Sequence, residues 1–432
     1  MIGFAGLSHL GIVSSAAAAS KGFETLGFDL DSTLCQNLDT GTLPIHEVGL
    51  QELISNNKHN LEYTCSAPDL AQCELVYLSC DVSTDANNCS DTRPLTQLAK
   101  TVTANMRENS TLIVLSQVSP GYTRELSKLL YDIMKKKRIA LFYQVETLIF
   151  GKAVERSLRP ERYMVGCMNP KAELPLLMKA YLESFGCPIF KMRLESAELA
   201  KISINFFLAA SVTTANTLAE LCEKIGADWS EIVPTLRLDA RIGPSAYLTP
   251  GLGIAGGNLE RDLATYITLG AKHGVDDSLP RMILNHSFHR KTWVLRTLHQ
   301  HVLSRINPSR IAVWGLAYKP NTKFVKNAPS LELISALRGI EVQLYDPEAR
   351  LEAPIIGVTE AASAMEACRG ADALVIMTAW DEFKRIKPAS IVPLLSKGAL
   401  PPLILDPAAA WNAAEVVHAG ARYITLGAAG ND

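Results

Sequence analysis

The sequence lacks the features that mark most nucleic-acid binders, metal proteins and secreted disulfide scaffolds. It has 42 Lys and Arg residues against 44 Asp and Glu residues, a net charge of −2, and so no basic surplus for binding nucleic acid. Its nine cysteines include no Cys-x-x-Cys pair and no Cys/His spacing typical of a metal site. An odd, scattered set of thiols is typical of a reducing compartment, where most act as small buried hydrophobes. We therefore expect no nucleic-acid partner and no metal.

The sequence pattern also predicts no targeting or membrane segment. Residues 1–6 enter an apolar strand with no positively charged stretch before it, and the small apolar run 12–19 ends at Lys21. That run is far shorter than the ~20 residues that cross a bilayer, and we expect no other segment to be long enough. With 48% apolar and 20% charged residues, the chain is expected to fold around a substantial core. The composition predicts a soluble cytoplasmic protein without a membrane partner.

Strand and helix patterns alternate at both ends of the chain. At the N-terminal end this predicts a parallel, doubly wound sheet, with strands at 2–5, 25–29, 75–79, 111–115 and 139–143 and helices at 11–21, 95–105 and 123–137. The middle is helical, and residues 197–224, which contain no Pro or Gly, predict one helix of about 28 residues. Alternation then returns, with strands expected at 311–314, 342–345, 373–377 and 403–405.

We therefore assign the chain to the α/β class. At roughly 150 residues per domain, 432 residues allow about three domains. We expect two Rossmann-like, doubly wound parallel-sheet domains, joined by a long central helix and a helical middle domain. The expected boundaries are 1–194, 195–301 and 302–432.

A dinucleotide-binding turn follows the first expected strand. Residues 6–11, GLSHLG, have Gly-x-Gly-x-x-Gly spacing, except that Ser8 replaces the middle glycine. In this motif the middle glycine lets the backbone approach a diphosphate. Gly6 permits the tight turn and Gly11 permits close helix packing. Asp29 follows about 20 residues later, where an acidic group accepts the ribose hydroxyls of NAD and disfavours NADP. The alternative is that Asp29 only caps a turn.

Two further patterns are typical of a substrate site. Lys201 and Asn205 are four residues apart on the expected long helix and share a face, where a lysine and an amide can hold and polarise an oxygen. Residues 250–262, PGLGIAGGNLERD, form a glycine-rich loop that runs into a helix, which indicates close backbone approach. The alternatives are a surface lysine and a flexible linker, although a linker would be rich in serine and charge rather than apolar.

At these motifs the sequence resembles the UDP-glucose/GDP-mannose dehydrogenase family, the nucleotide-sugar 6-dehydrogenases. The resemblance runs along nearly the whole chain. Besides the turn and Asp29, the N-terminal part has 41–50, GTLPIHEVGL, similar to the family's G-x-x-P-I-x-E-P-G-L, 116–121, near S-T-V-P-x-G, and Glu146 in VETL, where the family has P-E-F-L. The middle part has Glu198, Lys201 and Asn205 of the family's helix pattern and 239–243, DARIG, for D-x-R-I-G. The C-terminal part has 315–322, GLAYKPNT, for G-L-A-F-K-P-x-T, and the short matches YDP at 345–347 and TAW at 378–380.

The resemblance implies an N-terminal Rossmann domain for NAD, a long helix at a homodimer interface and a C-terminal Rossmann-like domain for the nucleotide sugar. The family oxidises the C6 alcohol twice, in sugar-derivative and polysaccharide biosynthesis. A first hydride goes to NAD, a cysteine attacks the aldehyde, the adduct gives a second hydride, and the thioester is hydrolysed.

Carried onto this chain, the resemblance implies three overlapping sets of site residues. Cofactor binding falls to Gly6, Ser8, Gly11, Asp29, Ser116, Arg261 and Lys326. Substrate binding falls to Glu146, Lys201, Asn205, Arg241, Gly253 and Lys319. Catalytic roles fall to Lys201, Asn205, Asp262, Glu146 and Asn258.

The main departure from the family lies in the glycine-rich loop. The family's loop reads G-F-G-G-S-C-F-P-K-D, and residues 253–262 put Asn258 at the cysteine position and Arg261 at the lysine position. No cysteine lies between Cys222 and Cys368, so a shifted alignment cannot supply one. Other changes fall mostly on the cofactor side: Val82 and Ser83 for Thr-Pro, Gln117 for a threonine, Phe150 for a second glutamate and Lys326 for an arginine.

Because an amide is not a nucleophile, we hypothesise one two-electron oxidation that gives a 6-aldehyde or runs reversibly. Lys201, with Asp262 and an ordered water, would take the hydroxyl proton and then hold the carbonyl oxygen, and Asn258 would hydrogen-bond the aldehyde or its hydrate. A Lys–Asn pair at this spacing is also similar to the β-hydroxyacid dehydrogenases, which oxidise once without cysteine. Three alternatives stay open: a non-catalytic, regulatory nucleotide-sugar binder, an epimerase-like enzyme with tightly bound NAD, and a dehydrogenase of another small alcohol.

Overall fold

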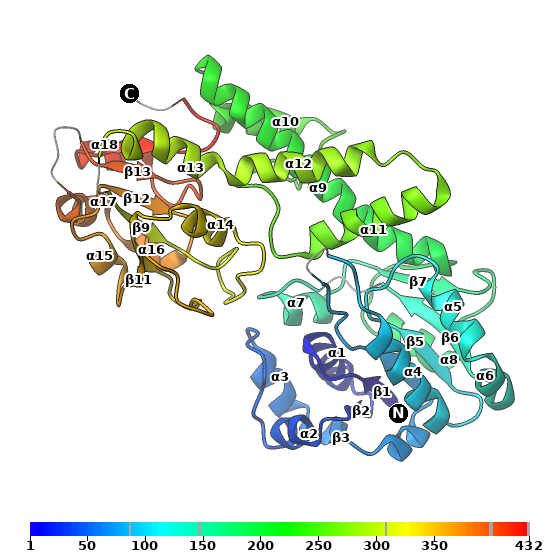
Figure 1. The fold of residues 1–432 in the computed structure, drawn as a ribbon. Coiled ribbons are helices and arrows are strands. Elements are labelled where there is room, and N and C mark those ends of the chain that lie inside the picture. Colours follow the sequence, from blue (N-terminus) through cyan, green and yellow to red (C-terminus); the bar gives the residue numbers. More distant parts are fainter. Residues whose placement is uncertain (86–87, 146–147, 307–308, 397–400, 430–432) are drawn as a thin grey trace. The chain divides into compact units, whose positions relative to one another are not determined.

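The computed structural model describes residues 1–85, 88–145, 148–306, 309–396 and 401–429. The chain forms two compact units, Met1–Ile204 and Asn205–Asp432, each built around one sheet (Figure 1). The division falls inside the long helix α9 (Leu194–Ile225). The three-domain division expected from the sequence stays a prediction.

The first unit contains an eight-stranded sheet of order β3-β2-β1-β4-β5-β6-β7-β8. Leu75 and Tyr77 of β4 pack into one buried cluster, and Val76 and Leu78 pack into another. Burial of both faces is typical of a parallel sheet covered by helices, and it confirms the doubly wound domain. One pair differs from the prediction, because β6 and β7 run antiparallel. The strands are β1 (Ile2–Ala5), β2 (Thr25–Phe28), β3 (Leu61–Thr64), β4 (Leu75–Leu78), β5 (Thr111–Val114), β6 (Ala140–Gln144), β7 (Tyr163–Cys167) and β8 (Ile189–Arg193).

Two of the three helices expected before the long helix, 11–21 and 95–105, are present as the single helices α1 and α4, whereas four further helices of this part were not predicted. The third expected helix, 123–137, differs, because the chain breaks at Leu130 into α5 and α6. The helices before α9 are α1 (His9–Ser20), α2 (Ser32–Asp39), α3 (Leu50–Asn56), α4 (Arg93–Asn105), α5 (Tyr122–Leu129), α6 (Tyr131–Lys137), α7 (Ala153–Leu158) and α8 (Leu176–Glu183).

Helix α9 is longer than expected, at 32 residues. In the described part of the chain, it is the one helix that is long and apolar enough, by length and composition, to cross a membrane. The expectation that no segment is long enough is therefore wrong. Its Glu198 is fully buried and accepts hydrogen bonds from the backbone N–H groups of Gly121 (2.6 Å) and Thr123 (2.9 Å). A buried carboxylate satisfied by protein donors is typical of a helix in a folded core.

The second unit joins a helical segment to a six-stranded parallel sheet of order β11-β10-β9-β12-β13-β14. All six strands repeat the order of the six strands from the corresponding edge of the first sheet, β3-β2-β1-β4-β5-β6, which confirms the second α/β domain. The strands are β9 (Arg310–Trp314), β10 (Glu341–Tyr345), β11 (Val358–Glu360), β12 (Ala373–Ile376), β13 (Leu403–Leu405) and β14 (Arg422–Ile424). The helices after α9 are α10 (Trp229–Leu238), α11 (Asn258–His273), α12 (Ser278–Lys291), α13 (Trp293–Leu298), α14 (Pro329–Ala336), α15 (Ala364–Ala367), α16 (Asp381–Arg385), α17 (Pro388–Ile391) and α18 (Ala413–His418).

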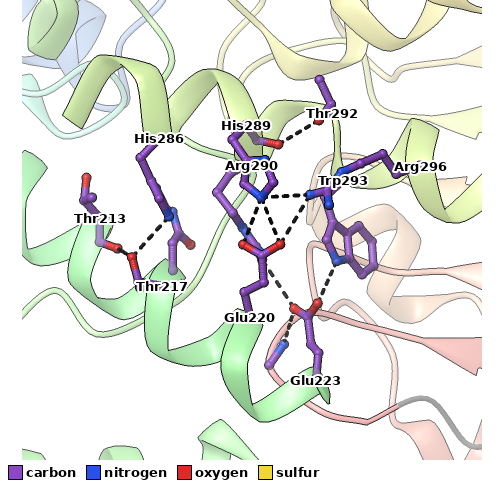
Figure 2. Close-up of polar contacts among 12 residues, drawn as sticks. Thr213, Thr217, Glu220, Glu223, His286, His289, Arg290, Thr292, Trp293 and Arg296 are labelled. Carbon is purple, nitrogen blue, oxygen red and sulfur yellow. Dashed lines mark hydrogen bonds and ion pairs between the residues drawn. The ribbon is translucent and has the colours of Figure 1, made fainter. Parts of the chain in front are cut away.

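Two glutamates near the end of α9 hold the helical segment of the second unit together (Figure 2). The fully buried Arg290 of α12 places Nη1 at 3.1 Å from Glu220 Oε2 and Nη2 at 3.4 Å from Glu223 Oε1. Glu223 also accepts hydrogen bonds from Trp293 Nε1 (2.9 Å) and from the backbone N–H of Gly427 (3.0 Å). The glutamate pair thus joins α9, α12, α13 and the segment after β14.

Candidate active site

The turn between β1 and α1 requires glycine at positions 6 and 11. Gly6 has φ of +94°, and a Cβ there would lie 2.6 Å from the Cβ of Cys80. A Cβ on Gly11 would lie 2.0 Å from the carbonyl oxygen of Gly6. The backbone therefore folds tightly at the start of α1, as close approach to a diphosphate demands.

Ser8 fits the middle position of this turn without backbone strain. Its φ of −73° and ψ of −173° are extended, so the position does not require glycine conformationally. The hydroxyl donates to the carbonyl oxygen of Ser79 (3.1 Å) and accepts from the backbone N–H of Asp81 (2.9 Å). It therefore bonds to the segment after β4 instead of capping α1.

Asp29 lies directly after β2 and faces the same turn. Its Oδ2 accepts the backbone N–H of Leu7 (2.7 Å), and its Oδ1 accepts the backbone N–H of Asp31 (3.1 Å). Asp29 is partly exposed, and each carboxylate oxygen keeps acceptor capacity. The residue can therefore brace the turn and accept ribose hydroxyls at once.

The second sheet has an aspartate in the equivalent position, directly after its second strand in chain order. Donors of the protein itself occupy the acceptor sites of this carboxylate. Oδ2 of the buried Asp346 accepts the backbone N–H groups of Leu316 (2.7 Å) and Ala317 (3.0 Å) and the Nε1–H of Trp380 (3.1 Å). Three donors on one oxygen leave it no further capacity. Of the two aspartates, only Asp29 is therefore suited to holding a ribose.

A buried carboxylate beside α1 ties three segments together. Oε1 of Glu47 lies 2.8 Å from His9 Nε2, and the carboxylate accepts hydrogen bonds from the backbone N–H groups of Gly151 (2.8 Å) and Ala153 (3.3 Å). The ring of Phe150 lies 4.4 Å from the ring of His9, measured between centroids. Sequence reasoning noticed Phe150 but missed the Glu47 contacts, because their partners lie 38 to 106 residues away.

Ser116, a predicted cofactor contact, lies buried between the ends of β4 and β5. Its hydroxyl donates to the carbonyl oxygen of Cys80 at 2.6 Å. Burial raises the pKa of the Cys80 thiol, so this cysteine is not prepared as a thiolate nucleophile.

In the second unit, four predicted site residues form one connected polar chain. Asn205 of α9 donates Nδ2–H to Oδ2 of Asp262 at 2.6 Å, and both side chains are buried. Arg261 Nε lies 3.7 Å from Asp262 Oδ1, and Arg261 Nη2 donates to Asn258 Oδ1 at 3.2 Å. Asn258 itself is exposed and is the first residue of α11. The tertiary fold thus brings Asn205 to residues that lie more than 50 positions later.

The glycine-rich loop before α11 is anchored to its surroundings and is not a free linker. Gly253 has φ of +82°, and a Cβ there would lie 2.6 Å from Ser287, whose Oγ accepts the backbone N–H of Ile254 at 2.9 Å. Gly256 has φ of +86°, and a Cβ there would lie 2.7 Å from the ring of Tyr318. Glycine is therefore required because neighbouring side chains occupy the space.

Glu260 closes the loop from the other side. Its Oε2 accepts the backbone N–H of Gly257 (3.1 Å), and its Oε1 accepts Asn327 Nδ2 (3.2 Å). A glutamate in the third position of a helix that bonds back to the cap residue is a recognisable sequence pattern. Sequence reasoning missed it here because the cap residue is glycine.

Two predicted lysines lie against the same loop. The Nζ of Lys319 lies 5.5 Å from the ring centroid of Tyr318, whose ring covers Gly256. The side chain of Lys326 lies within 3.5 Å of the position that a Cβ on Gly257 would take. Both lysines thus belong to the surroundings of the loop.

The remaining predicted residues are more scattered. Arg241 is exposed and pairs with Asp239 at 2.7 Å, which raises the pKa of the guanidinium. Lys201 lies on α9 one turn before Asn205. Glu146 lies outside the described residues. In the described part of the chain, no group of three His, Cys, Asp or Glu side chains is arranged to hold a metal ion.

A doubly wound sheet with a tight glycine turn and an acidic residue after its second strand defines a dinucleotide-binding Rossmann domain. Three sequence models of one family, UDP-glucose/GDP-mannose dehydrogenase, match the chain in order. The NAD binding domain matches residues 1–184, the central domain 195–286 and the UDP binding domain 312–413. The chain therefore belongs to the UDP-glucose/GDP-mannose dehydrogenase family, and its cofactor is NAD.

Individual relatives support the same assignment. UDP-glucose 6-dehydrogenase TuaD of Bacillus subtilis is 28% identical over 435 residues, covering 98% of this chain and 92% of the relative. UDP-glucose 6-dehydrogenase of Rhizobium meliloti is also 28% identical, over 98% of both chains. The fold matches UDP-D-ManNAc dehydrogenase from Pyrococcus horikoshii (TM-score 0.82, 24% identity, 99% of both chains). It also matches UDP-glucose dehydrogenase from Pyrobaculum islandicum (TM-score 0.80, 23% identity, 94% of this chain and 93% of that one).

Proposed function

We propose that this chain is an NAD-dependent nucleotide-sugar oxidoreductase that performs one two-electron step between a C6 alcohol and a C6 aldehyde. The proposal rests on Asn258, the first residue of α11, which stands where the resemblance in the sequence predicts the family's cysteine. An amide cannot form the thioester through which an aldehyde becomes an acid. The reaction then stops after one hydride: the alcohol loses a hydride from C6 and a proton from its hydroxyl, and a carbonyl remains.

The residues divide this step between them. NAD, when bound, supplies the hydride acceptor, and Gly6, Ser8, Gly11 and Asp29 would hold it. We assign Lys201 and Asp262 to removal of the hydroxyl proton, because both groups can relay a proton and the lysine can then polarise the carbonyl oxygen. Asn205, fixed by its bond to Asp262, and Asn258 are assigned to the C6 oxygen. Arg241, Gly253 and Lys319 are kept as predicted contacts of the nucleotide sugar.

The yield of NADH per sugar tests this proposal. Purified protein is supplied with UDP-glucose, UDP-N-acetylmannosamine and GDP-mannose in turn, with hydroxylamine present to trap an aldehyde. We expect one NADH per sugar consumed and a trapped 6-aldehyde oxime. Two NADH with a uronic acid product, or no NADH from any of the three, would contradict the proposal.

The variant Asn258→Cys tests whether position 258 sets the number of oxidations. A cysteine as the first residue of α11 benefits from the helix N-terminus and from nearby Arg261, both of which favour a thiolate. We expect this variant to form acid and a second NADH. Asn258→Ser is the matched control and should keep the one-NADH yield.

A regulatory, non-catalytic binder is the second candidate, favoured by the changes at Ser8 and Phe150 in the cofactor unit. Calorimetric titration with NAD separates the two candidates. Micromolar NAD binding supports the oxidoreductase, whereas binding of UDP-glucose without NAD would support the regulator. An epimerase-like enzyme with tightly bound NAD would instead convert its sugar without net NADH.

We further propose a homodimer formed through α9. In the second unit, Phe207, Leu218, Leu221 and Ile225 are exposed at helical spacing, and such a stripe is costly to leave in water. Light scattering should give twice the chain mass of 47.0 kDa, and Leu221→Glu should lower the measured mass.

We also propose a reducing, cytoplasmic location. All nine cysteines are described and free, which supports this location.

A further inference from the structure

Arg261 holds the amide of Asn258 in one orientation. The two residues lie one turn apart at the start of α11, and Arg261 Nη2 donates to Asn258 Oδ1 at 3.2 Å. A guanidinium has only donors, so the amide must turn its oxygen toward it. The Nδ2 group of the exposed Asn258 is then directed elsewhere, and it has no hydrogen-bond partner among the described residues.

The Arg261 guanidinium itself forms an ion pair with Asp262. Its Nε lies 3.7 Å from Oδ1 of Asp262, and only 11% of the Arg261 side chain is exposed. The other oxygen of Asp262 accepts the Nδ2–H of Asn205 at 2.6 Å, so a hydrogen bond fixes the carboxylate that forms the ion pair with Arg261. The orientation of Asn258 therefore depends on a buried arrangement rather than on a mobile surface arginine.

We propose that Arg261 is a positioning residue that makes Asn258 a one-way hydrogen-bond donor to the oxygen on C6 of a nucleotide sugar. This inference rests on the proposed two-electron function and adds a specificity residue to it. A carbonyl oxygen only accepts hydrogen bonds, whereas a hydroxyl both donates and accepts. A donor held in place therefore suits the aldehyde, the form that the oxygen takes once hydride and proton have left.

Lysine, which the family has at this position, cannot do the same. An ammonium on a flexible stem provides a point charge, whereas the planar guanidinium presents two donors in a fixed geometry. In the family a lysine stands three residues after a cysteine, which has no amide to orient. Arginine at 261 and asparagine at 258 thus form a functional pair.

A double-mutant cycle tests the pair. The variants are Arg261→Met, Asn258→Ala and the double variant, with Arg281→Met, from an exposed pair with Asp277, as the matched control. One readout is NADH oxidation with the 6-aldehyde of UDP-glucose, giving kcat and KM. The other is calorimetric affinity for that aldehyde relative to UDP-6-deoxyglucose, which lacks the C6 oxygen. The second readout needs no turnover.

We expect Arg261→Met to weaken the preference for the aldehyde over the deoxy sugar about tenfold, the effect of one misdirected hydrogen bond. In the Asn258→Ala background the same change should have an effect of less than about twofold, because the cycle subtracts the contact with Asp262. Arg261→Lys should recover only part of the loss. Equal effects in both backgrounds, or no preference for the aldehyde in the wild type, would overturn the inference. A wild type with the preference and the coupling but no NADH turnover would refute the proposed function and leave this inference standing.

Discussion

Asn205 donates its amide Nδ2–H to Oδ2 of Asp262 at 2.6 Å, between side chains that are 8% and 2% exposed. A carboxylate can only accept, so this bond directs the carbonyl oxygen of Asn205 away from Asp262. The bond connects helix α9 to the start of α11, where the glycine-rich loop ends. Loss of the Asp262 carboxylate should therefore act on α9 through this contact.

Replacement of Asp262 by asparagine should abolish most activity while the fold is kept. The new amide oxygen can still accept from Asn205, but the negative charge and the proton acceptor are lost. We expect the rate of NADH formation to fall about 10²- to 10⁴-fold, the usual contribution of a general base. NADH binding, measured by fluorescence, should be unchanged. Asp277→Asn is the control, and a loss of less than about tenfold in Asp262→Asn would argue against the assigned role.

Replacement of Asp29 by asparagine should weaken cofactor binding. An amide oxygen can still accept the backbone N–H of Leu7, so the turn is kept, but the charged acceptor for the ribose is lost. We expect the Kd for NADH to rise about 10- to 100-fold, as for the loss of a charged hydrogen bond. Discrimination against NADPH should fall in the same titrations. Asp31→Asn, which changes only the cap of α2, should leave both values near wild type.

The glycine-rich loop offers a matched pair of substitutions. At Gly256 an alanine would combine φ of +86° with a Cβ 2.7 Å from the ring of Tyr318, whereas at Gly251 nothing lies within 4 Å. Gly256→Ala should cost about 1–3 kcal/mol of stability, the usual cost of a strained backbone. Gly251→Ala should change stability by less than ~1 kcal/mol. Urea unfolding measures both, and equal midpoints would contradict the close packing of the loop.

Loss of Arg290 should destabilise the second unit. Methionine fills similar space but leaves Glu220 and Glu223 without their buried cation (Figure 2). Removing one partner of a buried ion pair costs about 3–5 kcal/mol, whereas the solvent-screened Arg281–Asp277 pair should contribute little to stability. Thermal unfolding of Arg290→Met and Arg281→Met gives the comparison. Similar Tm values for the two variants would show that the buried cluster carries little stability.

The same cluster predicts a loss of stability in acid. Burial raises the pKa of Glu220, but the hydrogen bond from His289 and the charges of Arg290 and His289 outweigh it and lower the pKa from 4.5 to about 2. A folded-state pKa below the unfolded value gives stability that is complete above about pH 4.5 and is lost as pH falls toward 2. We therefore expect the stabilities of wild type and Glu220→Gln to differ most above about pH 5, and the difference to shrink below pH 4.5 and vanish only as pH falls to about 2. A constant difference across this range would contradict the assignment.

The strands that the sequence failed to predict share a physical cause. Nine strands were expected, and the five missed strands include all four sheet edges: β3, β8, β11 and β14. An edge strand buries little, so its sequence has no continuous apolar run; β8 reads IFKMR with no buried residue. The exception is β7, which is fully buried but pairs antiparallel with β6, outside the expected alternation. Central strands such as β4 were predictable because both of their faces are covered.

The sequence by itself determined what depends on local chemistry. The glycines at 6 and 11 and the aspartate at 29 follow from spacing and residue type, and they indicated an NAD-binding domain. The asparagine at 258, with no cysteine between Cys222 and Cys368, is the sequence feature behind the proposed single oxidation. Only the tertiary structure decided how side chains are oriented. Ser8 bonds to the segment after β4, and the Asp346 carboxylate accepts from donors of the protein itself. Asn205 donates to Asp262, 57 positions later, and Arg261 donates to the amide oxygen of Asn258. Hydrogen-bond direction depends on which donors and acceptors meet in space, and sequence distance carries little information about that.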